Sequence, residues 1–170
     1  RRVGIAIARR EATLIGHERG KSAISVSLRQ RRATGQSAAQ CIEALLSQLP
    51  PDWQQCDLSI ALSSGDLSCT DCFEVKYRSA GAVAAIAGSL AESRCAGENA
   101  EDLAIDFSIN ATTKDSSTIE MLAIPHTTLD SIRAAVARAA PKCSLRLVSS
   151  IPSLLARMIE ADGIHAFSFD

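Results

Sequence analysis

The N-terminal part of the chain alternates apolar and polar residues with a period of two, which is typical of β-strands that bury one face. Three short runs rich in apolar and β-branched residues are separated by polar turns, at residues 3–8, 12–17 and 22–28. In the third run Ile24, Val26 and Leu28 share one face, and serines occupy the other. The pattern predicts a three-stranded antiparallel meander.

Helical spacing follows the meander. Ser37 is a candidate N-cap, and Pro50 and Pro51 end the segment. Between them the apolar residues recur at helical intervals, at Cys41, Ile42, Leu45, Leu46 and Leu49. This spacing predicts an amphipathic helix with one buried stripe.

The middle of the chain predicts two strands and a second helix. The strands are expected at 57–63 and between 67 and 75, and an alanine-rich helix is expected at 80–94. Gly81 and Gly88 interrupt this helix. We interpret them as positions that allow close helix packing.

The last part of the chain predicts a hairpin followed by shorter alternating helices and strands. A hairpin is expected from strands 103–109 and 118–124, joined by the polar turn 112–117. Thr127 or Thr128 is expected to cap a helix at 129–140. The remaining expected elements are a strand at 144–148, a helix at 153–161 and a strand that begins at 164.

Bulk composition fits an ordinary globular chain. The 170 residues suffice for one domain or for two small subdomains that share a core. Aromatic residues make up only 4%, so aliphatic side chains must build the core. No apolar run is long enough to cross a membrane, and no secretory signal is visible. Because the chain lacks an initial Met and its last expected strand lacks a partner, we expect a trimmed chain whose second lobe is missing.

Net charge is close to neutral, at −1, so no global field attracts nucleic acid. Arg29, Arg31 and Arg32 form a local basic cluster. The simpler interpretation is a solvated loop after a strand. A contact with a phosphate or with an acidic partner is the alternative.

Six cysteines are present, at positions 41, 56, 69, 72, 95 and 143. A chain with this much core does not need disulfides, so ordinary thiols are expected. Cys69 and Cys72 form a CxxC pattern, but a strand rather than a helix is expected after them, unlike a redox site. A zinc site needs about four ligands, and no second CxxC exists, while His17, His126 and His165 are scattered. Metal or redox chemistry therefore stays the minor alternative.

Candidate catalytic residues are few. The first strand carries no carboxylate, which argues against a nuclease that needs converging acids on metal ions. Asp106 is expected to be a solvent-facing strand residue, and His126 to belong to the lead-in of a helix rather than to act as a base. The remaining acidic candidates are Asp57, Asp66 and Asp71. No nucleophile elbow or phosphate loop occurs. We therefore predict no enzyme, no catalytic residues and no metal site.

A meander followed by helix, strand and helix is the order of an RNase H-like lobe. Within the second half, residues 121–132 and 139–147 resemble the actin-like pilus-assembly proteins of the PilM type and their GspL-type relatives in type II secretion. Residues 2–8, 58–63 and 103–109 are similar to strands of the same family. The resemblance covers nearly the whole chain and rests on element order and loose stretches rather than on a tight motif.

The resemblance implies an α/β fold with mixed sheets, in which an RNase H-like, actin-like lobe carries an inserted small β-α-β-β subdomain. Residues 1–97 would form the first lobe and 98–149 the insert. Residues 150–170 would return to the first lobe and begin the missing second lobe.

The resemblance also implies a cytoplasmic scaffold of a type IV pilus or type II secretion platform, at the inner face of the inner membrane. Its expected partner is the cytoplasmic tail of a PilN-type or GspM-type membrane protein, with an assembly ATPase and a second copy of the chain as further candidates. Nucleic acid and direct membrane insertion are not expected. Candidate contact regions are residues 103–109 and the exposed face of 129–140.

The family's opening turn carries an acid, a glycine and small hydroxyl residues that let backbone amides approach a phosphate. This chain has Ala6 at the acid and Ala8 at the glycine, followed by Arg9 and Arg10. The resemblance therefore implies a degenerate phosphate turn and no cofactor in this chain, with ATP binding only in a full-length protein. A degenerate lobe of an actin-like or sugar-kinase ATPase is the alternative function, and a thiol-dependent module using Cys69 and Cys72 is a weaker one.

Overall fold

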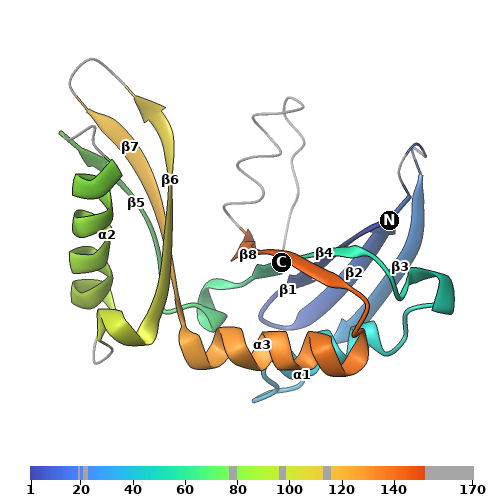
Figure 1. Ribbon diagram of the computed structural model, residues 1–170. Helices are drawn as coiled ribbons and strands as arrows, with labels where there is room; N and C mark the ends of the chain where they lie inside the picture. Colours follow the sequence, from blue (N-terminus) through green and yellow to red (C-terminus); the bar gives the residue numbers. More distant parts are fainter. Residues whose placement is uncertain (19, 21–22, 77–79, 96–98, 113–115, 152–170) are drawn as a thin grey trace.

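The computed structural model describes residues 1–18, 20, 23–76, 80–95, 99–112 and 116–151. These residues form two β-sheets and three α-helices (Figure 1). The predicted helix 153–161 and the strand from 164 lie outside the described residues. Within the described part, no helix is long and apolar enough to cross a membrane.

The larger sheet has five strands in the order β3-β2-β1-β4-β8. Its strands are β1 (Arg2–Ile7), β2 (Glu11–His17), β3 (Ile24–Arg31), β4 (Asp57–Leu62) and β8 (Ser144–Ser150). β1, β2 and β3 pair antiparallel, so the predicted meander is confirmed. β4 lies parallel to both β1 and β8, which makes the sheet mixed.

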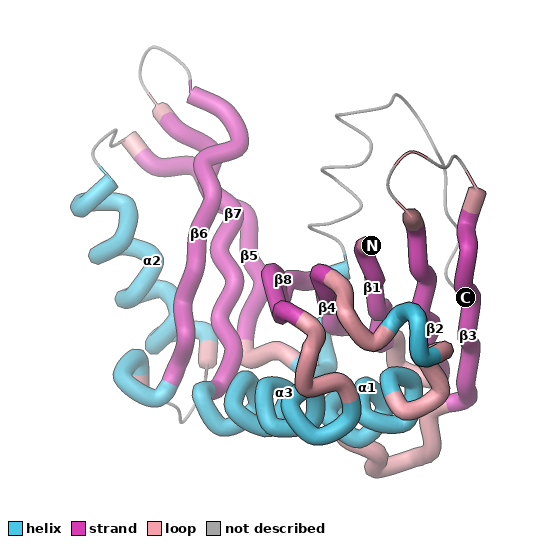
Figure 2. Tube along the Cα trace, turned by 45° about the vertical axis from the view of Figure 1, so that its right-hand side comes forward, coloured by secondary structure: helices cyan, strands magenta, loops and turns pink. Residues whose placement is uncertain are grey.

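Two helices cover one face of the large sheet, α1 (Ala38–Leu46) and α3 (His126–Ala139). They lie side by side along that face in both views (Figures 1 and 2). Ser37 caps α1 as predicted: its Oγ accepts a hydrogen bond from the Gln40 amide, and the Gln40 side chain accepts one from the Ser37 amide. The short 3₁₀ turn η1 (Pro51–Trp53) follows the helix, in agreement with the predicted proline stop.

The smaller sheet has three strands in the order β5-β7-β6, all antiparallel. They are β5 (Cys69–Val75), β6 (Leu103–Thr112) and β7 (Ser117–Pro125). Helix α2 (Ala80–Arg94) packs on the face of this sheet that points away from the large sheet (Figures 1 and 2). Short 3₁₀ turns lead into β5 (η2, Ser64–Asp66) and into β6 (η3, Ala100–Asp102).

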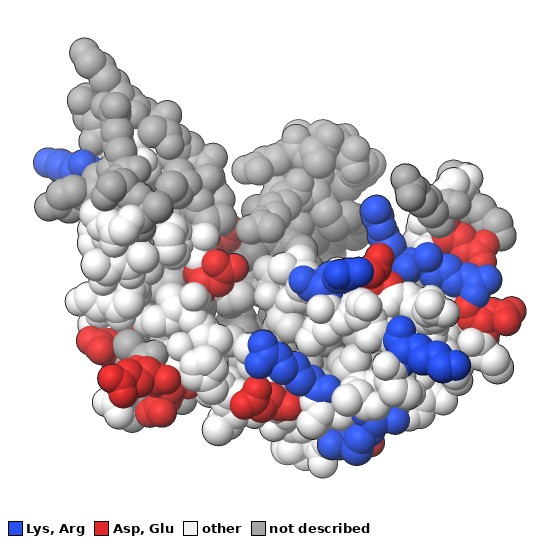
Figure 3. Space-filling model, in the orientation of Figure 1, with Lys and Arg blue, Asp and Glu red and all other residues white. Residues whose placement is uncertain are grey.

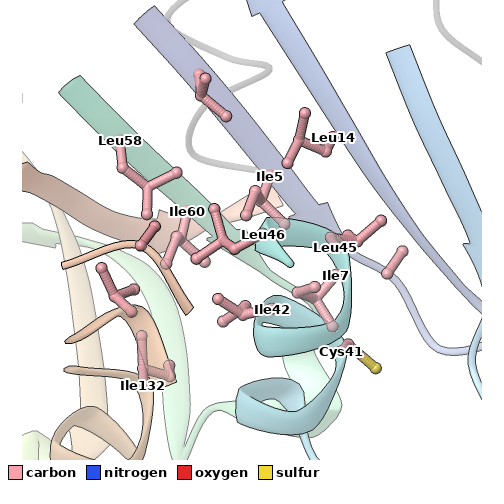
Figure 4. Close-up of a cluster of buried hydrophobic side chains, with 14 of the residues drawn as sticks. Ile5, Ile7, Leu14, Cys41, Ile42, Leu45, Leu46, Leu58, Ile60 and Ile132 are labelled. Carbon is pink, nitrogen blue, oxygen red and sulfur yellow. The ribbon is translucent and has the colours of Figure 1, made fainter. Parts of the chain in front are cut away.

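The main core lies between the large sheet and the helices α1 and α3 (Figure 4). Alternate residues of β1 point into it, because a strand turns successive side chains to opposite faces. Its largest fully buried side chains are aliphatic: Ile5, Ile7, Leu14, Ile42, Leu45, Leu46, Leu58, Ile60, Leu62 and Ile132. Ile124, at the end of β7, joins the same cluster and ties the small sheet to the large one.

The strand pairing divides the chain differently from the expected boundaries at residues 97 and 149. β5, at 69–75, pairs with β7 and so belongs to the small sheet, although it lies inside the range expected for the first lobe. β8, at 144–150, pairs with β4 and so belongs to the large sheet, although it was assigned to the insert. Both pairings join strands far apart in sequence, and the periodicity of a single strand does not specify its partner. The domain bounds themselves stay a prediction.

Two expectations about the helices are wrong. Helix α3 begins at His126 and has no side-chain cap, so neither Thr127 nor Thr128 is its N-cap. Gly81 and Gly88 do not allow close packing, because a Cβ built on either would meet nothing within 4 Å. The two glycines therefore lower the helix propensity of α2 and allow no closer packing in exchange.

Candidate functional site

Two adjoining hollows open between the large sheet, the small sheet and the starts of α1 and α3. They share three lining residues, Ser37, Gly65 and Asp66. We call the first hollow, of about 540 Å³, the inter-sheet groove; its other lining residues are Ala38, Ala39, Leu67, Ser68, Arg94, Cys95, Pro125, Thr127, Thr128 and Ser131. We call the second, of about 1320 Å³, the arginine hollow; its other lining residues are Arg9, Arg10, Arg31, Arg32, Ala33, Thr34, Gly35, Gln36 and Ser63.

An ion pair between Arg32 and Asp66 forms the boundary of the two hollows. Two guanidinium nitrogens of Arg32 each donate to a carboxylate oxygen of Asp66 at 2.6 Å. Only 12% of the Arg32 side chain and 9% of the Asp66 side chain are exposed. The hydrogen bonds from Arg32 to Asp66 raise the pKa of the arginine, and their geometry is bidentate.

Further hydrogen bonds lock this pair into the fold. The hydroxyl of Ser63 donates to Asp66 at 2.7 Å, and Arg32 Nε donates to the carbonyl of Gln36 at 2.9 Å. The Arg32 amide donates to the carbonyl of Arg10 at 2.9 Å. The pair therefore joins the end of β3, the lead-in of α1 and the turn η2. It also neutralises Asp66, the one carboxylate among the described residues that line the two hollows.

The basic cluster seen in the sequence is not a solvated loop after a strand. Arg29 and Arg31 lie within β3. Arg29 pairs with Glu11 of the neighbouring strand, and this bond lowers the pKa of Glu11. Arg31 is exposed and lines the arginine hollow, whereas Arg32 is largely covered. The three arginines thus have three different surroundings.

The turn that the resemblance identified as a degenerate phosphate turn joins β1 to β2. The Ala8 amide donates to the carbonyl of Glu11 at 2.8 Å and closes the turn. Ala6 lies in β1 on the face opposite the buried Ile5 and Ile7. Arg9 and Arg10 are exposed and line the arginine hollow together with Arg31. Since Arg32 is neutralised by Asp66, these three side chains leave the hollow with a net positive charge.

The inter-sheet groove is lined mainly by small and hydroxyl side chains. Pro125 precedes α3, and Thr127, Thr128 and Ser131 come from the first turns of that helix. The first four amides of a helix lack intrahelical acceptors, so this end of α3 favours acceptor or negatively charged groups. Arg94, at the end of α2, lines the opposite wall and forms an ion pair with Asp71 at 3.2 Å.

The CxxC residues do not form one unit. Cys69 and Cys72 are three positions apart in β5, so their side chains point to opposite faces of the small sheet. Cys69 instead lies within hydrogen-bonding reach of Cys95 at the end of α2, and burial is the main cause that raises the pKa of Cys69. Among the residues that the structure describes, no three His, Cys, Asp or Glu side chains cluster as a metal site would require.

The other candidate residues are dispersed. Asp57 pairs with Arg146 at 2.7 Å, and this bond lowers the pKa of Asp57. Asp106 is exposed in β6, which confirms the solvent-facing prediction. His126 is the first residue of α3, and His17 is the last residue of β2. His165 lies outside the described residues.

The two expected partner-contact regions differ in character. β6 is an edge strand of the small sheet, so one side of its backbone has no strand neighbour among the described residues. Its residues Leu103, Ile105 and Phe107 belong to or pack against the core under α2. The outer face of α3 carries polar and small residues, among them Asp130, Arg133 and Ala134.

Charge is divided between the two halves of the molecule. On the face shown in Figure 3, most basic side chains lie over the large sheet and its helices, and acidic side chains gather at the lower end of the small sheet. The turn η3 contributes Glu101 and Asp102 to that acidic end. Acidic side chains also lie over the large-sheet half, where several of them pair with arginines.

No protein-family model and no curated protein sequence matches the chain. Solved structures do match. One is the cytoplasmic domain of EpsL, an inner membrane component of the type II secretion system of Vibrio cholerae, with a TM-score of 0.56 and 8% identity over 87% of this chain and 56% of that one. Another is the PilM-PilN type IV pilus biogenesis complex, with a TM-score of 0.65 and 12% identity over 93% of this chain and 51% of that one.

These similarities confirm the predicted fold class, an α/β fold with mixed sheets. The actin-like lobe with an inserted subdomain stays a prediction. The chain spans about half the length of each of these structures. Identity at this level concerns the fold and does not transfer the activity or the partners of either protein.

Proposed function

We propose that this chain is a scaffold module of a type II secretion or type IV pilus platform. It acts by binding rather than by catalysis, at the cytoplasmic face of the inner membrane. Its partner is a short cytoplasmic segment of a PilN-type or GspM-type membrane protein. The fold supports this proposal, because solved structures with the same architecture are an inner membrane secretion component and a pilus protein in complex with PilN.

The single observation that carries the proposal is the inter-sheet groove. It lies where the two sheets meet and is lined by residues of α1, η2, α2 and α3. Its volume of about 540 Å³ is within the range of specific binding pockets, about 300–1,000 Å³. Small side chains such as Ser37, Ser68 and Ser131 leave room for the backbone of a peptide.

Charge indicates what kind of segment would fit. The arginine hollow continues from the groove past Asp66, and Arg9, Arg10 and Arg31 give it a positive charge. We therefore expect the bound segment to place apolar or small residues in the groove and acidic residues over the hollow. Exposed charges of this type raise the association rate more than they increase affinity.

A degenerate lobe of an actin-like ATPase is the second candidate, favoured by one observation. The arginine hollow lies at the β1–β2 turn, which is where the resemblance expects a phosphate. Against it, Ala6 and Ala8 supply neither a carboxylate for a metal ion nor a glycine for close backbone approach. We therefore expect weak attraction of anions in general rather than selective nucleotide binding.

Calorimetric titration tests the two candidates side by side. One titrant is a peptide from the cytoplasmic tail of a membrane protein that is encoded beside this one, and the other is ATP with Mg²⁺. The scaffold proposal expects binding heat from the peptide and none from the nucleotide. Heat from the nucleotide alone, at micromolar affinity, would favour the ATPase lobe instead.

A matched pair of variants on α3 locates the binding site. Ser131→Arg places a bulky charged side chain in the groove, and Ala134→Arg places the same side chain at an exposed position that does not line it. We expect the first variant to lose at least tenfold in peptide affinity and the second to bind like the parent chain. Equal effects of the two variants would show that the peptide binds elsewhere.

A further inference from the structure

Two cysteines come together at the edge of the large sheet, although 87 positions separate them in the sequence. Cys56 and Cys143 are both free thiols, and their sulfur atoms are 3.2 Å apart. Neither residue belongs to the CxxC pattern. The groove and the arginine hollow also do not include them.

The backbone places these two residues in register. Each immediately precedes a strand, Cys56 before β4 and Cys143 before β8, and the first residues of those strands, Asp57 and Ser144, are partners in the parallel ladder. The Ser144 amide donates to the carbonyl of Cys56 at 2.9 Å. Neighbouring strands lie about 4.8 Å apart, and a disulfide bridges Cα atoms about 4.4–6.8 Å apart. The backbone therefore has the spacing that a disulfide needs.

The two thiols differ in their access to solvent. Cys56 is 6% exposed, whereas Cys143 is half-buried and donates to the carbonyl of Gln54 at 3.3 Å. An oxidant from solution can therefore reach Cys143 first. Cys56 is then the thiol that lies within reach of any adduct on Cys143.

We propose that Cys56 and Cys143 are a redox-sensitive pair that closes into a disulfide when the chain meets a small disulfide oxidant such as oxidised glutathione. The Cys143 thiolate attacks one sulfur of the oxidant, which releases one glutathione thiol and leaves a mixed disulfide. The Cys56 thiolate then attacks the Cys143 sulfur and releases the second glutathione. Both cysteines lose a proton, one protein disulfide forms, and the oxidant is reduced to two thiols.

The environment of Cys56 sets the rate of this closure. Burial and the neighbouring Cys143 raise the pKa of Cys56 to about 12. At neutral pH very little of this thiol is ionised, and the thiolate is the attacking species. The second step should therefore be slow at neutral pH and faster in alkali, which keeps the pair reduced during brief exposure to an oxidant.

The disulfide would tie β8, the last strand of the large sheet among the described residues, to its neighbour β4. The closed loop would contain β4, the whole small sheet and α3. Cross-linking a loop of this length restricts the unfolded chain more than the folded one. This proposal is independent of the proposed scaffold function, because it concerns only the chain's own thiols.

The test is to incubate the folded chain with oxidised glutathione, block the remaining thiols and map the linked peptides by mass spectrometry. We expect a peptide pair joined through Cys56 and Cys143, and an increase in Tm of roughly 5–10 °C. Cys143→Ser should abolish both effects and leave a folded chain, because this side chain is partly exposed. Cys56→Ala should instead accumulate glutathione on Cys143.

Two results would overturn the proposal. One is a map without the Cys56–Cys143 link while the mixed disulfide on Cys143 persists at alkaline pH. The other is a link that forms only after the chain is unfolded in urea. The neighbouring thiols Cys69 and Cys95 are an internal comparison, since peptide mapping distinguishes a link between them from the expected one.

Discussion

The two sheets of this protein are stabilised by side chains of different size. The large sheet packs long aliphatic residues of β1, β2 and β4 against α1 and α3. The small sheet packs against α2, whose buried residues are Val83, Ala87 and Ala91. Ile86 and Leu90 of α2 pack against the same sheet but are only partly buried. Because buried apolar area drives folding, a helix whose fully buried residues are one Val and two Ala contributes less stability than one that fully buries Ile and Leu. One fold therefore joins a strongly packed region, the large sheet with α1 and α3, to a weakly packed region, the small sheet with α2.

The weak region still has a role in the proposed function. The groove is lined by Arg94 at the end of α2, by Cys95 directly after it and by Pro125 at the end of β7, so one wall belongs to the small-sheet region. Regions that open at low free energy are those from which binding elements are commonly drawn. We therefore expect amide hydrogens of β5 and β6 to exchange faster than those of β1 and β4.

Truncation of one buried residue in each region gives the largest expected effect. Ile42 in α1 and Val83 in α2 are both fully buried. Ile42→Ala should reduce the free energy of unfolding by about 3–4 kcal/mol, because it leaves a cavity in the main core. Val83→Ala should cost only about 1–2 kcal/mol, since it removes less volume and gains helix propensity.

Urea unfolding of both variants, followed by circular dichroism, measures this difference. If Val83→Ala were as costly as Ile42→Ala, the two regions would be equally well packed and the contrast would fail. A change in the slope with urea for only one variant would indicate that the small sheet unfolds separately.

The ion pair at the junction is the second way to test the comparison. Asp66→Asn keeps the size of the side chain and its hydrogen bond with Ser63 but removes the charge that faces Arg32. Since both side chains are largely covered, we expect a loss of about 2–3 kcal/mol. Because η2 leads into β5, exchange in the small sheet should increase more than exchange in β1.

An exposed ion pair provides the control for this variant. Glu43→Gln removes the partner of Arg138, which joins α1 to α3 at the surface, where 59% of the Arg138 side chain and 36% of the Glu43 side chain are exposed. Exposed pairs contribute about 0–1 kcal/mol. Hydrogen exchange read by mass spectrometry should therefore show little change, and a large change would mean that solvent does not screen this pair.

Much of the fold could be predicted from the sequence, but not all of it. The capping box at Ser37, the proline stop at Pro50 and the bounds of α2 follow from local chemistry, and the structure confirms them. The pairing of β5 with β7 depends on residues about fifty positions apart, and a period of two is the same whichever strand is the partner. The periodicity therefore does not specify which sheet β5 joins.

The site was harder to predict than the fold. Arg32 was visible as part of a basic cluster, but its partner Asp66 is 34 positions away. The sequence therefore suggested a solvated loop where the structure has a covered ion pair. The thiol pairs were missed in the same way, because the CxxC spacing drew attention to Cys72 while Cys95 lies beside Cys69.

A close contact in the large sheet gives the third prediction. Gly16 of β2 lies under the ring of Trp53, and a Cβ at this position would come within 2.6 Å of that ring. Gly16→Ala should therefore cost about 1–3 kcal/mol, because the indole must move out of a tightly packed position. Gly4→Ala in the adjacent strand is the control, since its Cβ would meet nothing within 4 Å.

Tryptophan fluorescence separates these two variants, because Trp53 is the chain's one tryptophan. A shift in its emission maximum is expected for Gly16→Ala and not for Gly4→Ala. If both variants unfolded at the same urea concentration as the parent chain, the packing of Trp53 on β2 would be looser than the structure indicates.

The smallest effect is expected in the weak region, and it has the opposite sign. Gly81 and Gly88 stand in α2 where an added Cβ meets nothing within 4 Å. Replacing either by Ala removes conformational freedom from the unfolded chain and should stabilise the protein by about 0.5–1 kcal/mol. Thermal unfolding of the single and double variants measures this gain, and the two effects should add because the positions are nearly two helical turns apart.

The gain in stability should also appear as slower amide exchange within α2, while amide exchange in β1 stays unchanged. A double variant that is less stable than the parent chain would mean that the two glycines serve a contact outside the described residues, and the weakness of α2 would then have a structural purpose.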